Sequence, residues 1–395
     1  MSANSRKQIG VLSFTLIVVM LGYGMVIPLF PFYIEKLGAG GGQLGLLISL
    51  SAFLELVFSP IWGSISDRTG RKPILLLGLA GYALSSLLFG LSTKMWMLYA
   101  SRALSGVLSS ATSATALAYI GDSTSERDRG GGMGMLGAAS GLGLILGPAI
   151  GGWLGHSSLA LPFFVAAGSS LLALELAALW LPESLPAEVH QKEGKVRTLN
   201  LGELWRALLG PVGLLMFLLF LSSLGLANFE SVFGLYAAQE LGYGPERVGT
   251  ILAVVGFVST AGKAVLIGPL TKRWGEAPII KVSLAASAVG FLILLLAVTY
   301  PGVLLATGVF ILCKTLLRTV IISLASKRTD ASRGMAMGLS SSFMSLGRIA
   351  GPIWAGFIFD VNVHYPYLSG AAIMLIGFLI SLIWVKGEQT PRAPA

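Results

Sequence analysis

The sequence predicts an all-α membrane protein in which twelve transmembrane helices form two six-helix halves. Three observations lead to this prediction: a strongly apolar composition, twelve runs of about 20 apolar residues, and motifs that recur between the two halves of the chain. A helix satisfies its own backbone hydrogen bonds, so it is the element expected to cross a bilayer in such a sequence.

The composition excludes an ordinary soluble protein. Of the 395 residues, 54% are apolar and only 11% are charged, and the mean hydropathy is +0.81. Soluble domains carry roughly 25% charged residues, because their surfaces face water. A helix that faces lipid needs almost none. The lipid bilayer is therefore the predicted environment.

Twelve apolar runs account for most of the chain. We place them near residues 9–33, 44–64, 74–92, 96–120, 132–154, 160–181, 211–237, 248–270, 279–298, 302–325, 334–360 and 365–386. The one long polar stretch, residues 182–205, separates six runs from six. We therefore expect an N-terminal half at residues 1–181, a cytoplasmic linker at 182–205 and a C-terminal half at 206–395.

An internal repeat relates the halves. One block, displaced by 205 residues, pairs Gly63, Arg68, Gly70, Pro73 and Ile74 with Gly268, Arg273, Gly275, Pro278 and Ile279. A second block, displaced by 204, pairs Arg129, Gly130, Met133, Gly134, Gly143, Gly147, Pro148 and Gly152 with Arg333, Gly334, Met337, Gly338, Gly347, Gly351, Pro352 and Gly356. Two blocks at nearly the same displacement indicate a duplication.

The basic residues predict the orientation of the chain. The formal net charge is +9, but the cations form no stripe with interleaved aromatic residues, so no nucleic-acid partner is expected. The cations of one side are Arg6, Lys7, Arg68, Arg71, Lys72, Arg127, Arg129, Lys192, Lys195, Arg197, Arg206, Lys272, Arg273, Lys281, Lys327, Arg328, Arg333, Lys386 and Arg392. Only Lys36, Lys94 and Arg247 fall on the other side. Because cytoplasmic loops are enriched in Lys and Arg, both termini are predicted to be cytoplasmic.

The sequence offers no visible enzymatic chemistry and no cofactor site. Cys313 is the only cysteine, so neither a disulfide nor a thiolate metal site is expected. The glycine-rich stretch at residues 38–45 lacks the Gly-Lys-Ser/Thr that binds nucleotide phosphates. No nucleophile has a base close to it in the sequence. We therefore expect a protein that is not an enzyme.

Three motifs carry a family resemblance. The loop from Gly63 to Pro73 (GSISDRTGRKP) joins the second and third runs and resembles the cytoplasmic signature loop of the major facilitator superfamily. Arg102-Ala-Leu-Ser-Gly106 is similar to the intramembrane arginine motif of that superfamily, and the stretch from Gly143 to Gly152 resembles the fifth-helix motif of its proton-driven antiporters. The resemblance covers essentially the whole chain.

Two further stretches, 223–236 and 351–367, resemble the multidrug-efflux antiporters of Gram-positive bacteria, and 95–155 is similar to the tetracycline exporters. Where Gram-negative tetracycline exporters carry aspartates, this chain has Val19 and Ser85. The acid that the multidrug proteins carry on helix 10 is replaced by Thr315, with Lys314 beside it.

The resemblance implies a function. We expect a monomeric, proton-coupled antiporter of the cytoplasmic membrane that exports small lipophilic compounds such as drugs by alternating access. Its partners would be protons, a small-molecule substrate and the bilayer. In the resembled fold, helices 1, 2, 4, 5, 7, 8, 10 and 11 surround a central cavity.

Charged residues within the predicted spans mark the candidate sites, because a charge at the bilayer centre costs roughly 3 kcal/mol or more. They are Glu55, Arg102, Glu175, Glu230, Lys263, Lys314, Arg318 and Arg348. All three histidines lie in predicted loops, so the proton carrier is expected to be a carboxylate. We assign proton coupling to Glu230, with Glu55 as the other candidate and Arg102 as the group that helps to expel the proton. A permanent structural ion pair is the alternative for both carboxylates.

The remaining candidates concern gating and substrate. For gating we name Asp67, Arg68, Gly70, Arg71, Arg348, Gly147 and Pro148. Asp67 is expected near the positive N-terminal end of the helix that follows Arg333, and Glu55 is expected to pair with Arg348 when the outside is closed. For the substrate cavity we name Lys263, Lys314, Arg318 and Asn228.

The cations among these residues leave two alternatives open. They attract an anionic substrate, which would make the protein an exporter of an anionic metabolite or lipid, or they serve packing. A non-transporting membrane receptor with the same fold is a further alternative.

Overall fold

The structure is a computed structural model that describes residues 3–123, 129–185, 202, 206, 208–210, 212–328 and 333–385. All regular secondary structure in these residues is helical. The chain divides into two compact units: unit 1 comprises Met1–Leu199 and Gly234–Gly256, and unit 2 comprises Asn200–Phe233 and Phe257–Ala395. The predicted linker at 182–205 lies largely outside the described residues.

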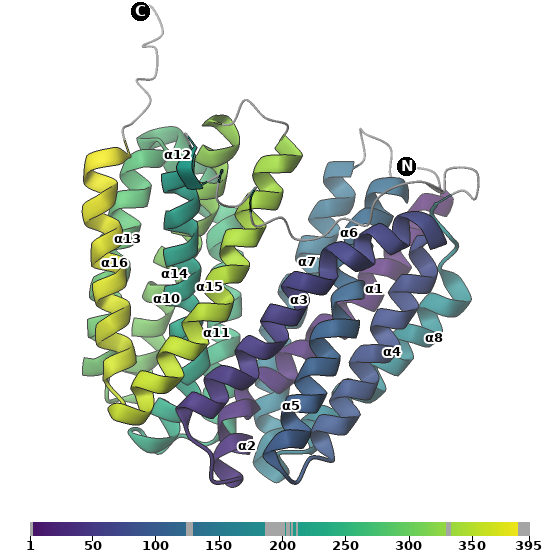
Figure 1. The fold of residues 1–395 in the computed structure, drawn as a ribbon, viewed down its shortest axis with the longest axis horizontal. Helices are drawn as coiled ribbons and strands as arrows, with labels where there is room; N and C mark the ends of the chain where they lie inside the picture. Colours follow the sequence, from purple (N-terminus) through teal and green to yellow (C-terminus); the bar gives the residue numbers. More distant parts are fainter. Residues whose placement is uncertain are drawn as a thin grey trace, which may run out of the picture. The chain divides into compact units, whose positions relative to one another are not determined.

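Figure 1 shows the helices in chain order from purple to yellow. The helices before residue 200 are α1 (Ala3–Val26), α2 (Phe30–Lys36), α3 (Gly41–Thr69), α4 (Arg71–Gly90), α5 (Met95–Leu104), α6 (Ser110–Ser123), α7 (Arg129–Ser157) and α8 (Leu161–Trp180). The later helices are α10 (Gly213–Gln239), α11 (Pro245–Val265), α12 (Ile267–Trp274), α13 (Glu276–Leu296), α14 (Tyr300–Arg328), α15 (Arg333–Val361) and α16 (Tyr365–Trp384).

Within the described residues, eleven helical segments are long and apolar enough to cross a membrane. A short 3-10 turn, Ile27–Leu29, joins α1 to α2 within one of them, and a π-helical segment, Ser105–Ser109, joins α5 to α6 within another. The 29-residue helix α15 is a further long helix. The predicted all-α membrane fold is confirmed.

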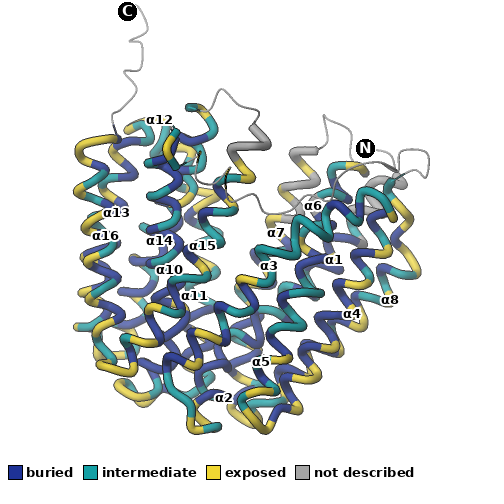
Figure 2. Tube along the Cα trace, viewed as in Figure 1, coloured by how far each residue is buried: buried dark blue, intermediate teal, exposed yellow. Residues whose placement is uncertain are grey.

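Exposed side chains on several helices are large and apolar, as expected for surfaces that face lipid. Figure 2 shows exposed positions in yellow along α4, α13 and α16. On α16 they include Leu375, Ile376, Leu379, Leu382 and Ile383. The opposite faces pack against neighbouring helices, and Met374 and Tyr367 of α16 are buried. Water would not favour such a surface, whereas lipid tails would.

Matching glycines make the same turn in the two sequence halves. Gly70 ends α3 with φ 99° and ψ 156°, and Gly275 ends α12 with φ 73° and ψ 174°. Both values of φ lie in the region that L side chains rarely adopt, so glycine is required at each turn. The expectation that the signature loop needs a glycine is therefore confirmed, and its counterpart 205 residues later has the same geometry.

Matching glycines also make the same helix contact. On α7, a Cβ at Gly147 would lie 2.7 Å from Gly24 Cα and 2.7 Å from Leu21 O, both on α1. On α15, a Cβ at Gly351 would lie 2.7 Å from Leu224 O on α10. Small residues allow two helix backbones to approach closely in a membrane. The repeat seen in the sequence therefore corresponds to a repeated packing contact.

Each unit has an aromatic core. In unit 1, Phe89 stacks on Phe163 with ring centroids 4.3 Å apart, and Tyr33 contacts both rings. In unit 2, Phe310 lies between Phe291 and Phe229, at centroid distances of 4.6 and 5.2 Å. These rings fix the helices that carry the candidate site residues.

Candidate functional site

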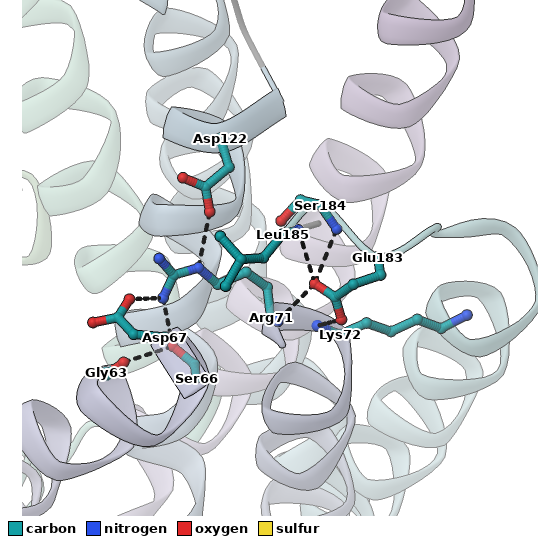
Figure 3. Close-up of polar contacts among 9 residues, drawn as sticks. All are labelled: Gly63, Ser66, Asp67, Arg71, Lys72, Asp122, Glu183, Ser184 and Leu185. Atoms are coloured by element: carbon teal, nitrogen blue, oxygen red, sulfur yellow. Dashed lines mark hydrogen bonds and ion pairs between the residues drawn. The ribbon is translucent and has the colours of Figure 1, made fainter. Parts of the chain in front are cut away.

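The turn between α3 and α4 holds a polar network centred on Arg71, which Figure 3 shows. Arg71 is buried, with 8% of its surface exposed. Its Nη1 pairs with Asp67 Oδ1 at 2.5 Å and donates to Ser66 Oγ at 2.7 Å. Its Nε pairs with Asp122 Oδ2, at the end of α6, at 2.9 Å. One guanidinium thus joins the ends of α3, α4 and α6.

Glu183 completes this network (Figure 3). Its carboxylate accepts the backbone N–H groups of Arg71 at 2.7 Å and Lys72 at 3.0 Å, which form the first turn of α4. It also accepts the N–H groups of Ser184 and Leu185. A carboxylate at a helix N-terminus compensates unpaired N–H groups and the positive end of the helix dipole. A Cβ at Gly70 would lie 2.5 Å from Glu183 Oε2, so this turn has no room for a side chain.

Sequence reasoning placed Glu183 in the linker and missed this role. Tyr119 Oη donates to Pro182 O at 2.7 Å, and Lys72 Nζ donates to Ala178 O at 2.7 Å. The end of α8 is therefore tied to α4 and α6. The available signal was a carboxylate directly after an apolar helix, but its partners lie more than 100 residues earlier.

Among the gating candidates, Gly147 and Pro148 are buried on α7. The helix lies between α1 and the first turns of α11: a Cβ at Gly152, one turn beyond Pro148, would lie 2.9 Å from Gly249 Cα. Arg68 is half-buried in the last turn of α3. The expected approach of Asp67 to α15 stays a prediction.

Arg102 is a buried cation of unit 1. Its Nη2 donates to Ser51 Oγ on α3, and its guanidinium lies 4.8 Å from the centroid of the Phe30 ring. The π-helical segment follows directly, and a Cβ at Gly106 would lie 2.7 Å from Ser51 O. Such segments are frequent at functional sites. Glu55, one turn after Ser51 on α3, is half-buried. The predicted relations of Arg102 to Glu230 and of Glu55 to Arg348 stay predictions.

Unit 2 brings the other charged candidates together. Glu230 on α10 is exposed, although Phe229, Ser231, Val232 and Phe233 beside it are buried. Three cations act electrostatically on its carboxylate: Arg348, Arg318 and Lys314, in decreasing order. Arg318 also interacts with Arg348, and Lys263 with Arg318. The sequence-predicted candidates of this half therefore form one cluster of four cations and one carboxylate.

Lys314 is the most enclosed member of this cluster, with 2% of its surface exposed. Its Nζ donates to Met374 Sδ on α16 at 3.1 Å, and a Cβ at Gly225 on α10 would lie 3.2 Å from it. Thr315 donates to Ser259 Oγ on α11 at 3.1 Å. The position at which the resembled multidrug proteins carry an acid thus has a neutral hydrogen bond here.

Asn228 has a packing contact. It is fully buried, and its Nδ2 donates to Pro366 O at the start of α16 at 2.8 Å. Ser231 Oγ donates to Asn228 O at 3.2 Å. These two side chains were expected to hydrogen-bond Glu230, but the contacts recorded for them lie elsewhere. In the described part of the chain, no group of three or more His, Cys, Asp or Glu side chains is arranged to hold a metal ion.

Comparisons with known proteins agree with this architecture. Among solved structures, the nucleoside transporter NupG covers 96% of this chain and 99% of its own, with a TM-score of 0.82 and 14% identity. A bacterial homologue of the human lysosomal transporter Spinster, in an inward-facing conformation, has a TM-score of 0.74, 15% identity and coverage of 99% and 100%. At these identities, the likeness concerns the fold.

Curated relatives are closer in sequence. Multidrug resistance protein 2 of Bacillus subtilis is 31% identical over 395 residues, which is 99% of each chain. Quinolone resistance protein NorA of Staphylococcus aureus is 30% identical over 382 residues, which is 96% of each chain. The family model described as Major Facilitator Superfamily matches residues 12–316 and 215–395. The chain therefore belongs to the major facilitator superfamily.

Proposed function

We propose that this chain is a proton-coupled antiporter that exports small lipophilic compounds by alternating access. It would act as a monomer in the cytoplasmic membrane, with both termini in the cytoplasm and without enzymatic activity. The observation that carries the proposal is the Glu230 carboxylate, which is accessible within a transmembrane helix and faces a set of cations. The names of the relatives in Bacillus and Staphylococcus support export of drug-like compounds.

Glu230 is suited to carry a proton. It is the only charged residue of α10, and a charge within the bilayer is rare unless it has a function or a partner. A carboxylate that is reached by water in one state of the protein and enclosed in the other links protonation to the conformational change. Glu55 is the second candidate, because it is half-buried within α3.

Arg102 would assist release of the proton from the carboxylate, since a nearby cation favours the charged form of an acid. Its contacts with Ser51 and Phe30 hold the guanidinium at a fixed place in unit 1. The gate on the cytoplasmic side would consist of the Arg71 network with Asp67, Arg68 and Gly70. The glycine contacts of α7 around Gly147 and Pro148 would let this helix shift against α1.

The first alternative is export of an anionic metabolite or lipid by the same fold. The observation that favours it is the excess of cations in unit 2: Lys263, Lys314, Arg318 and Arg348 against Glu230 alone. A receptor that transports nothing is the other alternative, and a flux measurement separates it from a transporter.

The test uses everted membrane vesicles in which respiration drives proton uptake and a fluorescent lipophilic dye reports transport. Wild-type protein should accumulate the dye only while the proton gradient lasts. Glu230→Gln should bind the dye and exchange it downhill but lose accumulation, because the coupling carboxylate is gone. Glu240→Gln, just beyond the end of α10, is the matched control and should behave as wild type.

Three results would contradict this proposal in different ways. Accumulation that survives in Glu230→Gln would move the coupling role to Glu55. Wild-type transport that ignores the proton gradient would exclude antiport with protons. Dye binding without any flux by wild-type protein would favour a receptor.

A further inference from the structure

We propose that Lys314 and Arg318, together with Lys263, form a subsite for an acidic group, and that the exported compounds are amphiphiles carrying both a carboxylate and a basic amine. This inference rests on the proposed export function and names the substrate class. The amine would pair with Glu230, and the carboxylate with the cations.

The first argument is the charge balance of the cluster. Its four cations face one carboxylate, that of Glu230. Within the described residues, no carboxylate lies within salt-bridge distance of Lys263, Lys314 or Arg318. The nearby acid Glu276 already pairs with Lys327 at the end of α14. Cations in a membrane interior normally have an anionic partner, so the vacant partner position in this cluster suits an anionic ligand group.

The second argument is how the cations are held. Lys314 is enclosed by α10 and α16, where a thioether rather than an acid is its hydrogen-bond partner. Arg318 lies one turn further on the same face of α14, because residues four apart are neighbours on a helix, and its side chain is exposed. Lys263 on α11 is also exposed and interacts with Arg318. Like charges held at one level repel each other unless an anion lies between them.

The third argument is the separation of the two polarities. Counting ~1.5 Å per residue from the ends of α14 (Arg328) and α10 (Gly213), Arg318 lies about 15 Å, Lys314 about 21 Å and Glu230 about 26 Å into unit 2. The acid and the outermost cation of the subsite are thus separated by about 10 Å along the bundle. Helix α10 carries no other charge, so a ligand that reaches both groups needs an apolar body.

The fourth argument is the logic of exchange. Antiport requires that the substrate and the proton exclude each other. An amine that pairs with the Glu230 carboxylate does so, because a protonated Glu230 cannot form the pair. A compound with a carboxylate alone would neutralise the cations without competing with the proton. Only a compound with both groups satisfies the cations and the exchange at the same time.

The experiment compares three probes on purified full-length protein in nanodiscs and on everted vesicles. The probes are ciprofloxacin, which carries an amine and a carboxylate; its ethyl ester, which keeps only the amine; and ethidium, a permanent cation. The variants are Arg318→Gln, Arg318→Lys and the control Lys272→Gln, an exposed cation of α12. Arg318 is exposed, so its substitution should not prevent folding.

We expect Arg318→Gln to raise the Kd of ciprofloxacin about tenfold, as loss of one charged hydrogen-bonded contact does, and to leave the ester and ethidium nearly unchanged. Arg318→Lys should restore part of the affinity, and Lys272→Gln should change none of the three. Equal losses for all probes, or no loss for ciprofloxacin, would overturn the subsite.

Two further outcomes separate this inference from its alternatives. An anionic phospholipid that co-purifies with wild-type protein but not with Arg318→Gln would show that a lipid phosphate occupies the cations, which overturns the substrate assignment. Proton-independent flux of all three probes would refute the proposed antiport, while the pattern of Kd values would still decide the subsite.

Discussion

A substitution of Gly147 by alanine should distinguish a packing glycine from an ordinary one. A Cβ at Gly147 would lie 2.7 Å from the backbone atoms of Leu21 and Gly24 on α1, whereas ordinary van der Waals contact begins at 3.4 Å. Backbone atoms of a helix cannot rotate away as a side chain can. The helices α1 and α7 must therefore separate or tilt.

The cost follows from two opposing effects. Alanine favours a helix over glycine by about 1 kcal/mol, whereas an added methyl group in a tightly packed contact costs about 1–3 kcal/mol. Gly137, on the same helix, has no neighbour within 4 Å of a built Cβ. Gly137→Ala should therefore keep or gain stability, and Gly147→Ala should be about 1–3 kcal/mol less stable than this control.

The assay is thermal unfolding of both variants in detergent, followed by dye flux in vesicles. Gly147→Ala should have a lower Tm than Gly137→Ala and slower flux, since α7 loses its close fit to α1. Gly351→Ala in unit 2 should repeat the effect, because its Cβ would meet Leu224 O at 2.7 Å. A Tm for Gly147→Ala equal to or above that of Gly137→Ala would refute the packing argument.

Three further predictions concern the polar contacts. Glu183→Gln, which removes the charge that caps α4, should lower stability by about 1 kcal/mol; Glu175→Gln on the exposed face of α8 is the control, and equal Tm values would contradict the role. Asp67→Asn should slow transport about fivefold, as expected for loss of ~1 kcal/mol of ion pairing, without blocking membrane insertion; normal flux at normal expression would disprove this. Glu55→Gln and Arg348→Gln should lower transport by less together than the sum of their single effects if they pair in one state, and strict additivity would argue against the pair.

The helices were predictable from the sequence because their cause is local. A run of apolar residues long enough to cross a bilayer has few alternatives to a helix. The turn at Gly70 was also predictable, since φ of 99° favours glycine at that position. Interruptions of the runs were not foreseen. The predicted helix 96–120 contains the π-helical segment Ser105–Ser109, and the predicted helix 9–33 contains a 3-10 turn at Ile27–Leu29.

The candidate site was predictable in its members and less so in its contacts. Charged residues in apolar runs are conspicuous, and unit 2 does bring Glu230, Lys314, Arg318 and Arg348 together. What an enclosed side chain touches depends on helices distant in sequence. The contact of Lys314 with Met374 and that of Asn228 with Pro366 follow from how α16 packs. Glu183 was missed for the same reason.

The internal repeat indicates which charges the scaffold itself requires. Displacement by 204 relates the glycine contacts of α7 to those of α15, so the duplicated halves need these residues for packing. The same displacement relates Arg348 to Leu144, Lys314 to Ser110 and Arg318 to Ala114. The first half thus forms its helices with no cation at any of the three positions. The fold does not require these cations, and a buried or cavity-facing charge is costly in a membrane. Their substitution should therefore change the choice of substrate more than membrane insertion, whereas substitution of the repeated glycines should do the reverse.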